Sequence, residues 1–289
     1  MNYIRIGKLD PNSLEKEMEI QLYENSRKNS LHRLNYILGF IEAKKPAILK
    51  DYISNLEKKL CGQVKGNIIA EKLIDTKKFY DDFEYLKKNQ NLANLAMNFY
   101  LQLLNPKEVK DWIKDKTKVL TGNYFRSFLV PMYYNVLTLT ETIGREEAVK
   151  LYKQYITHYL IDRHAGKKEN RYESAEEIFE KRKEDINSDS PWVIVCGMLK
   201  NGKYFYRNDN CIWIDALTDY PDSELKYLVC CYGDYEGAKA GLNSNFILTM
   251  EHTIAQGNKY CSRVVHDTRL DWDLRHPPTE FWDNLKPEE

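Results

Sequence analysis

Reactive side chains gather in one late stretch of the chain, CCYGDYEGAKAGLNSNFILTMEHTIAQGNKYCSRVVHD, residues 230–267. It holds three cysteines, two histidines and four acidic residues, interrupted by four glycines. Thiolates act as nucleophiles and metal ligands, and histidines and carboxylates transfer protons. The stretch therefore either lines a chemical site or uses its cysteines to staple a turn-rich fold.

The stapled fold is the weaker explanation, because we expect a cytoplasmic protein, in which thiols stay reduced, and the chain has no C-x-x-C pair and no zinc-finger spacing. The six cysteines are Cys61, Cys196, Cys211, Cys230, Cys231 and Cys261. Cys61 and Cys196 are assigned to packing, since cysteine behaves as a small hydrophobic residue. Cys230 and Cys231 end a short predicted helix beside Asp234, and a thiol near a carboxylate fits a nucleophile or a metal ligand.

Strand periodicity assigns the candidate residues outside the cysteine pair to the two faces of the predicted strands. In NFILTMEHTIAQ, residues 245–256, alternation places Phe246, Leu248 and His252 on one apolar face and Glu251 on the opposite face. Only one of Glu251 and His252 can then transfer a proton at a shared site, and a histidine on an apolar face is most simply a core residue with satisfied hydrogen bonds. On the next predicted strand Cys261 and Arg263 share a face.

The elements that position these residues divide the chain near residue 188. Apolar residues at helical spacing predict a helical region over residues 1–188, including a helix opened by Asn12 and a buried helix containing Pro131. Residues 189–289 predict an antiparallel sheet with one inserted helix at 221–231. Its strands are expected at 192–199, 203–207, 210–216, 245–256 and 260–270, with Asn201-Gly202 as a hairpin turn. The fold class is α+β, with the helical region packed on the sheet.

Composition excludes several classes of partner. Lys plus Arg equals Asp plus Glu at 43 each, so no long-range positive field favours nucleic acid. No apolar run approaches the roughly 18–20 residues that span a bilayer, and the first residues lack the hydrophobic stretch of a signal peptide. We expect a cytoplasmic protein with a small-molecule partner and no membrane partner, and leave a homo-oligomer open.

The late stretch resembles the L-2-amino-thiazoline-4-carboxylic acid hydrolase family over roughly residues 190–268, with a looser likeness in the helical region before it. The residues that carry the resemblance are Cys211, Cys231, Asp234, Gly241-Leu242-Asn243, Thr253, Gly257 and Cys261. The family motif usually ends G-D-x-x-C-D-F, whereas this chain has GNKYCSR, with Asn258 in place of the first acid and Ser262-Arg263 in place of the last two residues.

The resemblance implies a hydrolase that opens a cyclic amidine or amide C–N bond of a small cysteine-derived substrate. Cys231 is then the candidate nucleophile, with Cys211 and Cys261 as alternatives. Asp234 would bind the amidine or orient a donor, and His252 or Glu251 would transfer the proton. The remaining candidates would bind substrate: Asn243 at the developing charge, Tyr232 and Tyr235 beside the motif, and Arg263 at a substrate carboxylate.

Three alternatives stay open at this point. No metal is preferred, but Cys211, Cys231 and Cys261 with Asp234 or His252 could hold a zinc ion that activates water. The chain could also be a small-molecule-binding or sensory module of the vinyl-reductase-domain type, without turnover. A third interpretation is a biosynthetic enzyme acting on another amide. The shared-site interpretations require that Cys211, Cys231 and Cys261 converge near Asp234.

Overall fold

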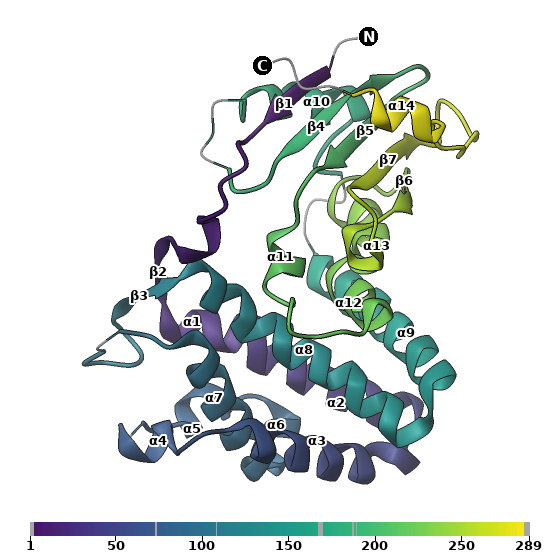
Figure 1. Cartoon of the computed structure of the whole chain (residues 1–289). Helices are drawn as coiled ribbons and strands as arrows, with labels where there is room; N and C mark the ends of the chain where they lie inside the picture. The colour runs from purple at the N-terminus through teal and green to yellow at the C-terminus, as the bar shows by residue number, and fades with distance from the viewer. Residues whose placement is uncertain are drawn as a thin grey trace. The chain divides into compact units, whose positions relative to one another are not determined.

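The computed structural model describes residues 3–285 except 73, 108, 167–169, 187 and 189, and the chain folds into two compact units. One unit is Asn12–Tyr155, and the other joins Met1–Pro11 to Ile156–Glu289. The first unit is mainly helical and the second combines helices with an antiparallel sheet, which confirms the predicted α+β class (Figure 1). This division differs from the predicted boundary at residue 188, because the sheet unit also takes the first strand and the end of a long helix.

The helical unit is built on long helices, of which α7 and α8 bury residues on more than one side. Its helices are α1 Leu22–Ser26, α2 His32–Lys44, α3 Leu49–Gln63, α4 Ile68–Glu71, α5 Lys77–Tyr80, α6 Glu84–Lys88, α7 Gln90–Leu104, α8 Thr121–Ile143 and the first part of α9 Arg145–His164. Helices α3, α7 and α8 pack on one another. The fully buried side chains of Tyr52, Met97 and Val130 lie in this core.

Two sequence predictions in this unit had different outcomes. The buried helix is confirmed as α8, which contains Pro131 and ends at Gly144 with φ of 82°. The helix predicted from Asn12 is wrong, because the chain makes only a 3₁₀ turn there and then forms strand β2, Glu17–Gln21. Strand β2 pairs antiparallel with β3, Lys116–Leu120. A partner almost one hundred residues later leaves no local signal in the sequence.

Among the described residues, five strands form the sheet of the second unit in the order β1-β4-β5-β7-β6, and each pair is antiparallel. The strands are β1 Tyr3–Ile6, β4 Ile194–Leu199, β5 Lys203–Asn208, β6 Phe246–His252 and β7 Cys261–Asp267. Strand β1 corrects the prediction that residues 1–188 are all helical. It pairs with β4, which lies about 190 residues away along the chain.

The hairpin between β4 and β5 is confirmed at Asn201-Gly202. Three residues, 200–202, connect the paired Leu199 and Lys203, and Asn201 and Gly202 have positive φ, 59° and 66°, as a tight hairpin turn requires. A Cβ at Gly202 would also lie 2.4 Å from the Cδ1 of the exposed Leu270 side chain, which would have to move to make room.

The connection from β5 to β6 holds more helix than predicted. The strand predicted at 210–216 is wrong, since both edges of β5 are already paired, with β4 and β7, and the chain instead forms α11, Ile212–Asp215. The inserted helix is confirmed as α12, Ser223–Cys230, whose N-terminus is capped by the Asp222 carboxylate. A further helix, α13 Gly233–Gly241, replaces the loop expected after it.

Both faces of the sheet are covered. On one face α10, Ala175–Lys183, and α13 pack over a core that includes Cys196, Phe246 and Val265. On the other face α14, Thr279–Asp283, packs Trp282 against Phe205 and Val264. Successive residues along each strand therefore face two separate environments, and the cavities described below lie on the first face only.

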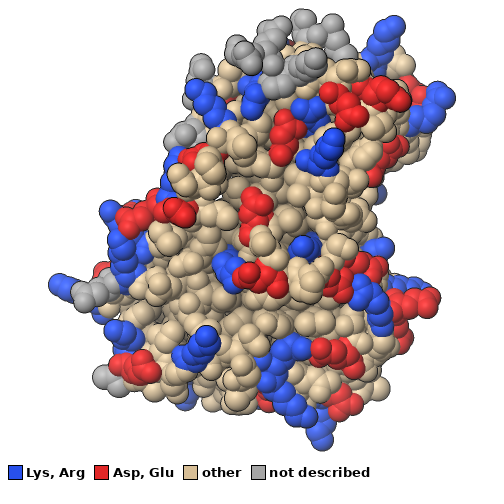
Figure 2. Space-filling view, viewed as in Figure 1, with Lys and Arg blue, Asp and Glu red and all other residues tan. Residues whose placement is uncertain are grey.

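Charges are mixed over the visible surface, where Figure 2 shows acidic and basic residues interspersed on the face in view. This distribution agrees with the zero formal net charge. Within the described part of the chain, no helix has the length and apolarity needed to cross a membrane.

The histidine on the covered second face should make stability depend on pH. Burial lowers the pKa of His266 to about 4, and its Nε2 lies 2.8 Å from the Thr249 hydroxyl. Below a pH of about 6.5 the unfolded chain binds a proton here that the folded chain does not bind until about pH 4. The free energy of unfolding should therefore fall as pH drops through this window, by up to about 1.4 kcal/mol per pH unit.

Chemical denaturation of wild type and His266→Gln between pH 7 and pH 4 measures this contribution. The His266→Gln protein should show a shallower dependence on pH, whereas His158→Gln, at an exposed position, should keep the wild-type slope. An unchanged slope in His266→Gln would show that His266 gains its proton in the folded state as easily as in the unfolded chain.

Candidate functional site

Two adjoining cavities lie on the sheet face that α10 and α13 cover. The first has a volume of about 540 Å³ and the second about 560 Å³. The residues that line both are Arg182, Asp185, Ile194, Tyr206 and Asp234. The first cavity is otherwise lined by residues of the 171–182 segment, α13 and the sheet, and the second by residues near the end of β5 and of α12.

A buried ion pair joins Arg263, which lines the second cavity, to Asp234, which lines both. Arg263 on β7 donates from Nη2 to the Asp234 Oδ2 at 2.9 Å and from Nη1 to the Asn208 Oδ1 at 3.0 Å. The guanidinium also lies 5.5 Å from the centre of the Tyr206 ring. Arg263 was predicted to meet a substrate carboxylate, but both of its Nη groups already donate to side chains of this chain, and its buried Nε has no partner. Arg263 lines the second cavity, where it holds Asp234.

Asp234 combines surrounding protein with access to the cavities. It lies in the first turn of α13, where the helix dipole favours a negative charge. Its side chain is 37% exposed, and it lines both cavities. Burial nevertheless raises the pKa of this carboxyl, and Arg263 only partly offsets the effect. A carboxyl group that is accessible to a small molecule and has a raised pKa is suited to accept and return a proton.

Three thiols line the second cavity, those of Cys211, Cys230 and Cys231. Burial raises the pKa of each, to about 12 for Cys211, and the negative charge of Asp234 raises that of Cys231 further. Cys231 is 2% exposed. All three are therefore protonated at neutral pH while the cavity is empty, and Cys231 needs a base before it can act as a nucleophile.

Cys261 lies outside both cavity linings. Its sulfur accepts a hydrogen bond from the Ile254 backbone N–H at 3.2 Å, which fixes the turn after β6. The structure thus brings Cys211 and Cys231 together with Asp234 but gives Cys261 a separate partner. Among the described residues, no three His, Cys, Asp or Glu side chains group closely enough to hold a metal ion. The geometry therefore gives no support to the zinc alternative with Cys211, Cys231 and Cys261 as ligands.

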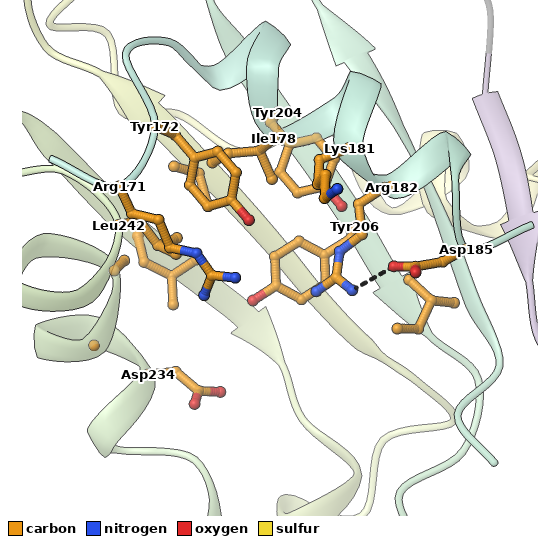
Figure 3. Close-up of a pocket in the computed structure, with 15 residues that line it drawn as sticks. Arg171, Tyr172, Ile178, Lys181, Arg182, Asp185, Tyr204, Tyr206, Asp234 and Leu242 are labelled. Carbon is orange, nitrogen blue, oxygen red and sulfur yellow. Dashed lines mark hydrogen bonds and ion pairs between the residues drawn. The ribbon is translucent and has the colours of Figure 1, made fainter. Parts of the chain in front are cut away.

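The first cavity has a cationic wall opposite Asp234. In Figure 3 the Arg171 guanidinium points into the space between Tyr172, Tyr206 and Asp234. It lies 5.2 Å from the centre of the Tyr172 ring. Within the described residues it has no carboxylate partner, whereas Arg182 pairs with Asp185 and Lys181 with Glu184. Arg171 is thus the cation of this wall that a bound anion can reach without displacing an ion pair.

Tyr206 supplies a hydrogen-bond donor to the same space. Its ring stacks on Tyr204, with ring centres 5.6 Å apart, and its hydroxyl points toward the Arg171 side of the cavity (Figure 3). Burial raises the pKa of Tyr206 above its ordinary value. The hydroxyl therefore stays protonated and can donate to a negative charge.

The two proton carriers predicted on β6 lie away from the cavities. A β-bulge between Met250 and His252 pairs His252 with Ser262, so His252 turns to the opposite face from Arg263. Its Nδ1 lies 2.9 Å from the Ser262 hydroxyl. Glu251 is exposed, 3.9 Å from His276. The predicted face of His252 is wrong, because one extra residue inverts the alternation.

Apart from Arg263, the predicted substrate-binding residues also lie outside the linings. Asn243 is fully buried, and its Nδ2 donates to the Tyr172 carbonyl oxygen at 2.8 Å. The backbone N–H groups of Arg171 and Tyr172 donate to the Leu242 carbonyl oxygen at 2.7 and 3.2 Å. Asn243 thus holds the cationic wall in place rather than facing the cavity. Tyr232 and Tyr235 pack on each other, with ring centres 5.8 Å apart, and neither lines a described cavity.

Sequence analysis missed the cationic wall itself. Arg171 and Tyr172 follow a basic, irregular segment, and Lys181 and Arg182 lie in a short helix with charges on every side. Such a helix is typical of a solvated surface. The available signal was a cluster of four arginines and lysines in residues 163–171 directly before this helix, but charge runs of this kind usually face solvent.

Removal of the Asn243 side chain should loosen the cationic wall. Asn243→Ala leaves the Tyr172 carbonyl without its donor and the Asn245 N–H without its acceptor, which should cost about 1–3 kcal/mol of unfolding free energy. Hydrogen exchange should also become faster at the backbone amides of Arg171 and Tyr172. The matched control is the exposed neighbour, Ser244→Ala. Wild-type exchange at both amides in Asn243→Ala would contradict the positioning role.

Comparison with known proteins bears on the same region. Residues 124–264 match the model of the family described as L-2-amino-thiazoline-4-carboxylic acid hydrolase. The matched residues include every charged residue of the two cavities, from Arg171 to Arg263. Neither a search of curated proteins nor a search of solved structures gave a match. The resemblance seen in the sequence is confirmed by this match: residues 124–264 of the chain have the sequence pattern of the L-2-amino-thiazoline-4-carboxylic acid hydrolase family.

Proposed function

We propose that this protein hydrolyses a C–N bond in a small cyclic amidine or amide that carries a carboxylate. The observation that carries the proposal is the placement of Arg171 and Asp234 in one cavity. A guanidinium without a carboxylate partner among the described residues shares that cavity with an accessible carboxyl group. A thiazoline acid has both complementary groups, a carboxylate and an amidine, and the family match supports that substrate class.

In the proposed complex the two ends of the substrate meet opposite charges. The carboxylate would accept hydrogen bonds from Arg171, since a guanidinium binds carboxylates through two parallel donors. The amidine or amide nitrogen would donate to Asp234. The Tyr206 hydroxyl would donate to negative charge that develops at the carbon under attack. The ion pair with Arg263 would keep the Asp234 carboxylate in a fixed direction.

The proposed reaction uses Cys231 as the nucleophile and Asp234 as the proton carrier. The thiol proton passes to the Asp234 carboxylate as the sulfur bonds to the amidine or amide carbon. The C–N bond then breaks, and the leaving nitrogen takes the proton from Asp234. Water then cleaves the C–S bond between Cys231 and the substrate carbon, and the Cys231 thiol recovers its proton. Asp234 is needed as a base because burial keeps the Cys231 thiol protonated, with a raised pKa.

Substitution at Cys231 and at Asp234 tests these roles. With 2-amino-thiazoline-4-carboxylate as substrate and product followed by chromatography, Cys231→Ala should abolish turnover and retain binding. Asp234→Asn keeps the shape and loses the base, so kcat should fall by about 10²–10⁴-fold. Cys61→Ala, at an exposed position in the helical unit, is the matched control and should remain active. If Cys231→Ala remained active, the thiol could not be the nucleophile, and water activated by Asp234 would take its place in the proposed reaction.

The pH profile tests Asp234 independently of product identity. As a base it acts when deprotonated, and its pKa is raised above the ordinary aspartate value of about 3.9. The acid limb of the pH profile of kcat/KM should therefore report a pKa above that value. Removal of the Arg263 charge should move this limb to still higher pH, because the cation favours the ionised carboxylate. Arg263→Gln is compared with Arg263→Lys, which keeps the charge, and a shift of the limb to lower pH in Arg263→Gln would contradict this assignment.

A binding module without turnover is the second candidate. The protonated state of the three cavity thiols favours it, because an empty cavity offers no ready thiolate. This candidate predicts that wild type binds the ring acid and releases it unchanged, as measured by calorimetry and by chromatography of the recovered ligand. Turnover that depends on Asp234 would exclude it.

A further inference from the structure

The second cavity exceeds what the proposed ring acid needs. A ring acid that spans Arg171 and Asp234 occupies the first cavity, of about 540 Å³. Cavities of roughly 300–1,000 Å³ hold drug-sized ligands, so this one cavity already suffices for a small ring. Beyond Asp234 the second cavity adds a separate space of about 560 Å³ that the ring acid leaves unfilled.

Beyond the shared wall the second cavity has an apolar side, and the polar residues of its lining there are Ser188, Ser190, Asn208 and Arg263. Trp192 and Trp213 meet edge to face there, with ring centres 6.0 Å apart, and both are half-buried. Ile6 and the protonated thiols of Cys211 and Cys230 complete this side. Its charged member, Arg263, is bound to Asp234 and Asn208. Aromatic and thiol surfaces of this kind favour an apolar group over a second carboxylate.

Shared walls connect the two spaces at the proposed reaction centre. Tyr206 and Asp234 line both cavities, so a molecule whose amidine meets Asp234 has one end in each. The carboxylate end faces the Arg171 wall. The opposite end faces the tryptophan pair.

We infer that the substrate is two-armed: a carboxylate arm at Arg171 and an apolar arm of about the size of a phenyl ring in the second cavity, joined at the amidine or amide that is hydrolysed. This inference rests on the proposed function and narrows its substrate class. The ring acid without an apolar arm is then a minimal substrate that leaves the binding energy of the tryptophan side unused.

The test compares 2-amino-thiazoline-4-carboxylate with the same acid bearing a phenyl group on its exocyclic nitrogen. Wild type should hydrolyse the phenyl compound with a kcat/KM at least about tenfold higher, as burial of a ring of that size allows. Trp213→Ala should lower this ratio toward one. The exposed Trp272→Ala is the matched tryptophan control and should keep the wild-type ratio.

Binding of both compounds, measured by calorimetry, separates the inference from the proposed function. If wild type binds the phenyl compound more tightly and Trp213→Ala loses this advantage, the two-armed ligand is supported even where no turnover occurs. A lack of turnover of both compounds would refute the proposed hydrolase. Turnover of the unsubstituted acid with equal or weaker binding of the phenyl compound overturns the inference and leaves the hydrolase standing. If circular dichroism shows that Trp213→Ala is unfolded, Trp192→Leu is used as the variant instead. The ratio of kcat/KM for the phenyl compound to that for the unsubstituted acid, measured on wild type, still tests the inference without any variant.

Discussion

The buried ion pair between Arg263 and Asp234 ties together elements that lie far apart in the sequence. A guanidinium that is only 8% exposed needs acceptors for its charge, and the two Nη groups of Arg263 have them although its Nε has no partner. Asp234 at the start of α13 and Asn208 at the end of β5 supply them, and Tyr206 offers its ring face. A one-residue slip of β7 would move Arg263 to the other face and leave these groups unpaired. The ion pair therefore fixes the register of the sheet and the position of α13 together.

The two faces of the sheet divide the polar residues into separate groups. Arg263, Tyr206 and Asp234 lie on the side of α10 and α13, where the cavities are. His252 and His266 contact Ser262 and Thr249 on the side of α14. The β-bulge at β6 completes this separation by turning His252 away from the cavities. In the proposed reaction, proton transfer is therefore assigned to Asp234, because the histidines of the late stretch face the other side of the sheet.

Local signals in the sequence predicted the parts of the fold that neighbouring residues determine. The Asn201-Gly202 turn, the helix inserted at 221–231 and the helix around Pro131 depend on backbone preference within a few residues, and each is confirmed. Strand β1 and the loss of the predicted strand at 210–216 depend instead on which distant strand occupies each edge. The same difference holds for the site. Cys231 and Asp234 are adjacent to one helix end. Arg171 instead lines the first cavity with Asp234, and its backbone is held by a contact with Leu242 that no local pattern contains.

Burial of the site sets conditions on any chemistry there. The environment that raises the pKa of Asp234 makes it a stronger base, but it raises the pKa of the Cys231 thiol as well. Transfer of a proton between them in the empty cavity therefore gains little, and the cavity thiols stay in the less reactive protonated form. A bound amidinium changes this balance, because its positive charge favours the negative charge that the sulfur gains as its proton leaves. Activation of the nucleophile would then depend on the substrate's own charge, so a neutral amide of the same shape should react more slowly at this site than an amidine.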